Sequence, residues 1–468
     1  MSKFDDIKIP ENIDEVTKIA INRGKKYNKS KRYKKVMIAS AASIAVGTSI
    51  IGIGIMNPSI ADSIPILKNI VEYFNTNNES LYKSDKDEFE KLGTEINLTT
   101  KDKGIELTLD SASVDENYLT IFYTIKTEKN IKETYEVHHD ASFANPYIGV
   151  YIDGEDIVPM GSSESEATFS SENELKGMCK VDISYIKLND NIEFIFETDS
   201  IFRVEGNWSI TTRVDKSKSD NDTYRYELDK DFVLNKTDKN MNGENYNVIN
   251  NVNIERVIIS PLANKIVINE KIENPRVDCD PIMLSAFALF DQNGKSLDVI
   301  DKGGRGSNTK TGIATNSIEF LKADKNTTSL TLVPFEFDES LQNNQLEPQS
   351  IDKLPVEFEG SNYGKVILED VQIKEKEIRY TYYKDGVVPG NIHFSFFDKD
   401  KNEIIINGGV TRTAIDRNTG RYTAIWKFEG YEDETNISKF KEIKYASIYK
   451  DNSFKLLYNQ EMKIDLVK

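Results

Sequence analysis

The sequence predicts a mainly β protein in which an N-terminal transmembrane helix is followed by about three β-sandwich modules. Three observations support this fold class. Residues 36–56 form an uncharged apolar stretch directly after a basic run. From about residue 94, short runs rich in Val, Ile, Thr, Tyr and Phe are separated by clusters of Asn, Asp, Gly and Lys, which is the pattern of strands and turns. A strand–turn–strand unit recurs three times within this second part.

Residues 1–35 are predicted to be a cytoplasmic basic arm with a short amphipathic helix at 11–23. Acidic residues occupy the first turn of this helix and basic residues follow, as the helix dipole favours. Its apolar face consists of Ile9, Ile13, Val16 and Ala20. A single helix has too little core to fold alone, so we expect this face to bind a partner. A cytosolic protein and the inner leaflet of the membrane are both candidates.

Residues 36–56 are predicted to span the bilayer. A helix of this length measures about 31 Å, close to the ~30 Å hydrocarbon core. The topogenic residues are Lys31, Arg32, Lys34 and Lys35, because short basic flanks stay in the cytoplasm. We therefore expect a single-pass protein of the cell membrane, with a cytoplasmic N-terminus and residues 57–468 outside the cell. The alternative is a cleaved signal peptide, but the apolar core exceeds the usual length of about 7–15 residues.

The charge of the chain is divided unevenly on the two sides of the predicted span. The net charge is −17 in total and +6 over residues 1–35, so the residues after the span carry −23. A positive arm suits an anionic inner leaflet, which makes the lipid bilayer the first expected partner. The acidic exterior argues against nucleic-acid binding, which requires a basic surface.

Residues 57–93 are predicted to be a juxtamembrane helical segment. Ser63 can cap a helix, and Pro65 suits its first position. The residues at helical spacing on one face are Ile66, Leu67, Ile70, Val71 and Phe74. This apolar face either rests on lipid headgroups or packs against the first extracellular module.

The repeated strand–turn–strand units begin at Ile105, Val252 and Val366. Each is followed by a further strand that ends in an Asp-rich turn, as hairpin chemistry prefers. The predicted modules, each of ordinary domain size, are residues 94–215, 216–355 and 356–468. An immunoglobulin-like arrangement is one candidate, because the order of strands in a sheet is not encoded in local patterns.

No catalytic, cofactor-binding or metal-ligating residue is predicted. The sequence lacks H-E-x-x-H and G-x-S-x-G motifs, a glycine-rich phosphate loop and Cys/His metal spacing. His138 and His139 on a strand would point to opposite faces, so a surface loop is favoured over a metal site. The run Asp238–Gly243 begins like a calcium loop, but Ile249 stands where a bidentate Glu is needed. We therefore expect a protein that is not an enzyme.

Four phrases, taken in order, resemble a family of single-pass membrane proteins of Gram-positive bacteria. They are Asn57–Leu67, Phe89–Gly93, Lys103–Leu109 and Leu119–Tyr123. The ectodomain of this family is a domain of unknown function, family 4179. The resemblance covers roughly residues 30–215. The second module, with Ser260-Pro261, resembles a companion domain that often follows the first.

The resemblance implies a function as well as an architecture. Members are frequently encoded beside extracytoplasmic-function sigma factors and are described as anti-sigma factors. Residues 1–35 would then hold such a sigma factor at the membrane. One departure is that the zinc-binding His/Cys motif of many anti-sigma domains is absent, since residues 1–35 contain neither His nor Cys.

The function predicted is that of an anti-sigma-factor-like or envelope-sensing regulator, which couples an extracellular β ectodomain to the cytoplasm. Because one helix transmits little conformational change, cleavage near Ile55–Ala61 by an intramembrane or site-specific protease is the expected mechanism. The alternative is a membrane-anchored envelope-binding or adhesion protein without a cytosolic partner. In that case the arm serves only to set the topology.

Overall fold

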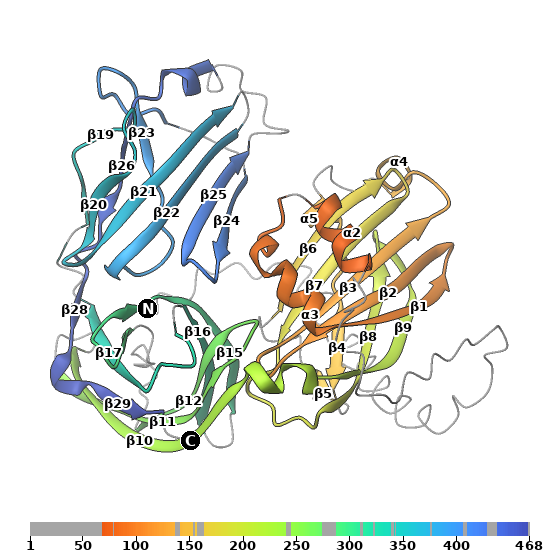
Figure 1. Cartoon of the computed structure of the whole chain (residues 1–468), viewed down its shortest axis with the longest axis horizontal. Helices are drawn as coiled ribbons and strands as arrows, with labels where there is room; N and C mark the ends of the chain where they lie inside the picture. The colour runs from red at the N-terminus through yellow and green to blue at the C-terminus, as the bar shows by residue number, and fades with distance from the viewer. Residues whose placement is uncertain are drawn as a thin grey trace, which may run out of the picture. The chain divides into compact units, whose positions relative to one another are not determined.

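The computed structural model confirms the predicted β class, because the chain it describes is mainly β with several antiparallel sheets (Figure 1). The residues described are 68–77, 79–135, 141–152, 155–156, 163–239, 245–273, 287–308, 312–321, 323–337, 341, 343–374, 377–405, 410–427 and 438–466. The predicted arm and span, residues 1–56, lie outside these ranges. Within them, no helix is long and apolar enough to cross a membrane.

The first module is a sandwich of two sheets with the strand orders β1-β2-β3-β7-β6 and β5-β4-β8-β9. The bounds are β1 Gly93–Asp102, β2 Ile105–Val114, β3 Tyr118–Thr127, β4 Gly149–Ile152, β5 Glu155–Asp156, β6 Ser163–Ser171, β7 Glu174–Asp182, β8 Asn191–Ile201 and β9 Val204–Asp215. Two short helices, α4 Ile131–Tyr135 and α5 Ala141–Ala144, connect β3 to β4. Trp208 fills the core between the sheets, and its indole nitrogen donates to the Ile105 carbonyl at 2.9 Å.

A helical segment precedes these strands and covers the outer face of the five-stranded sheet (Figure 1). It consists of α2 Lys68–Thr76, the 3₁₀ turn η1 Lys83–Asp85 and α3 Lys86–Leu92. Ile70 and Phe74 of α2 are buried in one apolar cluster with Phe122 and Met178 of the sheet. Of the two expectations for this apolar face, the structure shows packing against the first module.

The second module has a five-stranded sheet, β10-β11-β12-β16-β15, that packs on a sheet of β14, β13, β17, β28 and β29. The bounds are β10 Tyr224–Lys239, β11 Asn245–Ile259, β12 Asn264–Glu273, β13 Phe287–Asp291, β14 Ser296–Leu297, β15 Val299–Asn308, β16 Ile313–Phe320, β17 Ser329–Phe337, β28 Phe454–Leu456 and β29 Met462–Asp465. The 3₁₀ turn η2 Ser217–Asp222 connects it to the first module.

The third module repeats this plan with the orders β20-β21-β22-β25-β24 and β19-β26-β23. The bounds are β18 Asn344–Gln345, β19 Gln349–Ser350, β20 Val356–Ser361, β21 Tyr363–Lys374, β22 Glu377–Val387, β23 Ser395–Phe397, β24 Val410–Asp416, β25 Arg421–Lys427, β26 Tyr445–Ser447 and β27 Tyr449–Lys450. Two 3₁₀ turns, η3 Ser438–Glu442 and η4 Tyr458–Gln460, lie in the last part of the chain.

The five-stranded sheets of the three modules share one topology. Three strands form a meander, the fourth crosses to the second sheet, and a hairpin then returns so that its second strand pairs with the third. In the first and second modules this is the ABED and CFG order of an immunoglobulin-like sandwich with one strand added before A. In the third module β19, which precedes the meander, pairs with β26 in place of a last strand. In each module the second strand carries one extra residue against the third, at Asp110, Glu255 and Glu369. An acidic residue at the same β-bulge in every module is therefore part of the repeat.

The second and third modules are joined twice, because the third is inserted into the second. After β17 the chain enters the third module, where β19 pairs with β26. At its end the chain returns, and β29 pairs with β17 of the second module (Figure 1). Residues 356–468 are predicted from the sequence to form the third module together, whereas Met462 and Ile464 belong to the core of the second. Which distant strand completes a sheet cannot be read from local alternation.

Candidate functional site

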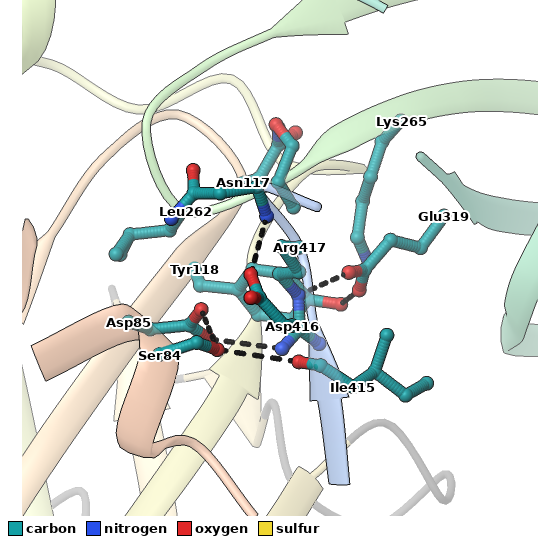
Figure 2. A network of polar contacts seen from close by, with 12 residues as sticks. Ser84, Asp85, Asn117, Tyr118, Leu262, Lys265, Glu319, Ile415, Asp416 and Arg417 are labelled. Atoms are coloured by element: carbon teal, nitrogen blue, oxygen red, sulfur yellow. Dashed lines mark hydrogen bonds and ion pairs between the residues drawn. The ribbon is translucent and has the colours of Figure 1, made fainter. Parts of the chain in front are cut away.

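A buried polar network joins the three modules at one place (Figure 2). Arg417, in the turn between β24 and β25, donates from Nε to Glu319 Oε1 of β16 at 2.7 Å. Its Nη1 donates to Asp85 Oδ2 of η1 at 2.9 Å. One guanidinium thus bridges carboxylates of the first and second modules, a pairing for which its planar set of donors is suited.

Tyr118 of β3 stands beside this bridge and donates from its hydroxyl to Glu319 Oε2 at 2.5 Å. Lys180 and Lys265 place their ammonium groups 3.8 and 4.2 Å from the centre of the Tyr118 ring. Lys265 also pairs with Asp182 Oδ2 at 2.5 Å. Positive and negative side chains of the first and second modules therefore surround the Tyr118 ring.

These charges decide the protonation state of Glu319. Burial raises the pKa of this carboxyl group, but the positive charges of Arg417, Lys180 and Lys265 outweigh it and lower the pKa to about 2. Burial raises the pKa of Asp85, and the positive charges of Arg417 and Lys180 offset only part of this effect. The network consequently favours the ionised form of Glu319.

A second set of contacts fixes the β2–β3 turn of the first module to the β11–β12 turn of the second. Asp115 accepts hydrogen bonds from Ser260 Oγ at 2.6 Å and from the backbone nitrogen of Leu262 at 2.9 Å. Asn117 Nδ2 donates to Ser260 Oγ and to the Ala263 carbonyl, both at 2.8 Å. Asp115 and Asn117 are fully buried, so the two turns meet without intervening solvent.

We call the residues of these two sets the module junction. They are Asp85, Asp115, Asn117, Tyr118, Lys180, Asp182, Ser260, Lys265, Glu319 and Arg417. A further contact holds the second and third modules: Tyr422 Oη donates to Asp298 Oδ2 at 2.6 Å, and Lys384 lies 3.3 Å from Asp298 Oδ1.

The carboxylates of the module junction are buried and paired. Asp85, Asp115, Asp182 and Glu319 each accept hydrogen bonds or ion pairs from neighbouring groups. In the described part of the chain, no group of three or more His, Cys, Asp or Glu side chains is placed to hold a metal ion. What the arrangement can do is fix three modules against one another, and breaking it would leave charges without partners.

The residues that the sequence analysis assigned to a cytosolic partner or to topology lie outside the described residues. These are Ile9, Ile13, Val16, Ala20, Lys31, Arg32, Lys34 and Lys35. His138, His139 and the turn after Lys239 lie outside them as well. The module junction was missed, because its members look like ordinary turn and strand charges in a chain with 77 acidic residues. The one local signal was Asp115, an acidic residue directly after β2 and before the largely apolar β3.

A family model described as a domain of unknown function, DUF4179, matches residues 28–127. The chain is a DUF4179-containing protein. This match confirms the resemblance seen in the sequence, although it ends at β3 and does not reach residue 215. A second model, the family of unknown function DUF5643, matches residues 229–360 of the DUF4179-containing protein. The two matches contain the turns that meet at Asp115 and Ser260.

No curated protein matches the chain. Among solved structures, it is similar to the crystal structure of the conserved domain protein from Bacillus anthracis, with 16% sequence identity and a TM-score of 0.35. The similarity covers 71% of this chain and 90% of that one.

Proposed function

We propose that this chain is a single-pass membrane protein that couples its extracellular β modules to the cytoplasm through the helical segment 68–92. Residues 36–56 are the span and residues 1–35 the cytoplasmic arm. The observation that supports coupling is that the helical segment contacts all three modules. It begins only twelve residues after Met56, the last residue of the predicted span.

The contacts of the helical segment with the first module are both apolar and polar. Its aromatic and aliphatic side chains close the outer face of the five-stranded sheet. Between its helices, Ser80 Oγ and the Leu81 backbone nitrogen donate to Glu166 of β6 at 2.7 and 2.8 Å. Because Glu166 is buried in the sheet and accepts both hydrogen bonds, it fixes the connection between α2 and η1 to the first module.

The same segment also contacts the other two modules. Leu262 and Ala263 of the second module belong to the apolar cluster that contains Phe89 and Leu92. The third module is reached through Asp85 and Arg417, and through an ion pair between Glu79 and Lys427. A change in how the modules meet would therefore act on the chain directly beside the predicted span.

In the cytoplasm, we propose that the arm holds a regulator through the face of Ile9, Ile13, Val16 and Ala20. The resemblance to sigma-factor-associated proteins supports an extracytoplasmic-function sigma factor as that regulator. Cleavage near Ile55–Ala61 after the modules rearrange would release the arm together with its cargo.

A crosslinking pull-down tests this function. Full-length protein in its native membrane is compared with a chain lacking residues 2–22, which keeps the basic run at 31–35. We expect a sigma factor to be captured by the full-length chain alone. Val16→Asp should abolish the capture, whereas Asn22→Asp, on the opposite face of the predicted helix, should retain it. If both chains captured the same cytosolic partners, the arm would serve only as an anchor and the proposed regulatory function would be contradicted.

A further inference from the structure

We propose that the second module carries a saccharide-binding groove on the outer face of its smaller sheet. The groove has a cavity volume of about 460 Å³ and is open to solvent. It is lined by residues of the β13–β14 hairpin, of β17 and of the C-terminal stretch from η4 to β29. This proposal does not depend on the cytoplasmic arm or on membrane coupling.

The groove arises from strand alternation on β17 and β29. Leu330 and Leu332 of β17 point into the core, so Ser329 and Thr331 face outward into the groove. On β29, Met462 and Ile464 are buried, and the residues between and beside them line the groove. Because the chain returns from the third module to the second, its C-terminal stretch supplies four of the eleven residues that line the groove.

The lining combines rings with groups that bond hydroxyls. Phe290 and Tyr458 are aromatic, and the Tyr458 side chain is 56% exposed. The carboxylates of Asp291, Glu461 and Asp465 and the hydroxyls of β17 are potential acceptors and donors. A sugar ring presents a C–H face that packs on an aromatic ring and hydroxyls that bond such groups, so the two halves of the lining match its two kinds of surface.

The charge of the groove excludes anionic polymers. Asp291, Glu461 and Asp465 oppose a single positive group, Lys463, which lies 3.1 Å from Glu461. A phosphate-rich or otherwise anionic ligand would be repelled. A neutral sugar, or one that bears an amine, is favoured.

Recognition of a peptide by strand addition is disfavoured at the same place. β17 is already paired on both sides, with β13 and β29. The outer edge of β29 is approached by β10, since Lys230 Nζ donates to the Lys463 carbonyl at 2.6 Å and Gln460 bonds the backbone of Asn235. In the part of the chain that the structure describes, β17 therefore has no free edge for an added strand beside the groove.

Isothermal titration of the full-length chain in lipid nanodiscs tests the proposal. The probes are cellotetraose, tetra-N-acetylchitotetraose, chitosan tetramer and tetralysine. We expect saturable binding of at least one saccharide, and Tyr458→Ala should weaken it roughly fivefold to tenfold through loss of ring packing. Glu461→Gln should lower the affinity for the same saccharide.

The matched control is Tyr449→Ala. Tyr449 is 54% exposed but is not among the residues that line the groove. Its replacement should leave the affinity unchanged. The proposal would be overturned by an equal loss of affinity in both tyrosine variants. It would also be overturned if tetralysine alone bound, or if no saccharide showed saturable binding. None of these outcomes bears on the sigma-factor pull-down, so the two proposals fail separately.

Discussion

Arg417 donates to Glu319 at 2.7 Å across 98 residues of sequence, and it does so from one module to another. The same guanidinium reaches Asp85 beside the first module. Since Arg417 sits at the tip of a hairpin, it is the part of the third module that enters the contact between the other two. Arg417 is therefore one side chain that contacts both of the other modules.

Replacing Arg417 should therefore be costly. In Arg417→Met, Glu319 and Asp85 remain buried without their main counter-charge, and we expect a loss of about 3–5 kcal/mol in the free energy of unfolding. Urea unfolding of the full-length chain measures this. Arg421→Met is the matched control, because Arg421 is more exposed and pairs with Glu369 of its own module; it should cost at most about 1 kcal/mol. Equal costs would contradict a special role for Arg417.

The C-terminal strand should stabilise the second module although it follows the third. Ile464 is fully buried in the second core, so Ile464→Ala should destabilise by about 2–5 kcal/mol. The exposed neighbour Lys463→Ala should change stability by less than about 0.5 kcal/mol. Hydrogen exchange locates the effect, which we expect in β17 and β12. An effect confined to strands of the third module would contradict the assignment of β29 to the second module.

Removing the acceptor at Asp115 should loosen the contact between the first two modules. Asp115→Ala leaves the Leu262 backbone nitrogen buried without this acceptor, at about 1–3 kcal/mol for the unmet donor, and removes the shorter of the two hydrogen bonds that Ser260 Oγ donates. Asp398→Ala is the control, since Asp398 accepts backbone hydrogen bonds only within a surface turn. Limited proteolysis should cut the first variant faster, between the first and second modules. Similar cleavage of both variants would argue against the contact.

The bulge carboxyl of the first module should give stability a pH dependence. Burial raises the pKa of Asp110 to about 6, although Thr124 Oγ1 donates to it at 2.6 Å. The unfolded value is about 3.9, so the contribution of Asp110 is favourable below about pH 4 and is lost as the pH rises through 6.

Asp110→Asn removes this titration and keeps a polar side chain at the bulge. We expect the variant to gain about 1–2 kcal/mol relative to the parent between pH 4 and pH 7, a figure reduced for the partial exposure of Asp110. Thermal unfolding at pH 4, 5.5 and 7 measures the difference. A constant difference at all three values would show that Asp110 does not titrate in this range.

Local sequence pattern predicted much of this fold. The period-two runs at Ile105, Val252 and Val366 are the second strands of the three modules, and each is followed by the hairpin partner expected. The apolar face of α2, at Ile70 and Phe74, is buried against the first module, which was one of the two arrangements expected. These features follow from neighbours in the chain, which is why a single sequence contains them.

Long-range choices could not be predicted in the same way. Nothing near Met462 or Ile464 indicates that this strand pairs with β17, more than a hundred residues earlier. Arg417 lies in a polar Asp-Arg-Asn-Thr-Gly turn of a kind that is usually solvated, and its burial depends on two other modules. The structural role of a charged side chain depends on the groups with which it pairs, and tertiary packing determines those groups.

Hydrogen exchange of the helical segment tests the central claim most directly. Full-length chains in nanodiscs are compared as parent, Arg417→Met and Arg421→Met, and peptides of residues 68–92 are followed by mass spectrometry. If the helical segment couples the modules to the predicted span, Arg417→Met should speed exchange around η1 and α3, while Arg421→Met should not. Unchanged protection of residues 68–92 in Arg417→Met, with faster exchange only in the third module, would contradict the coupling.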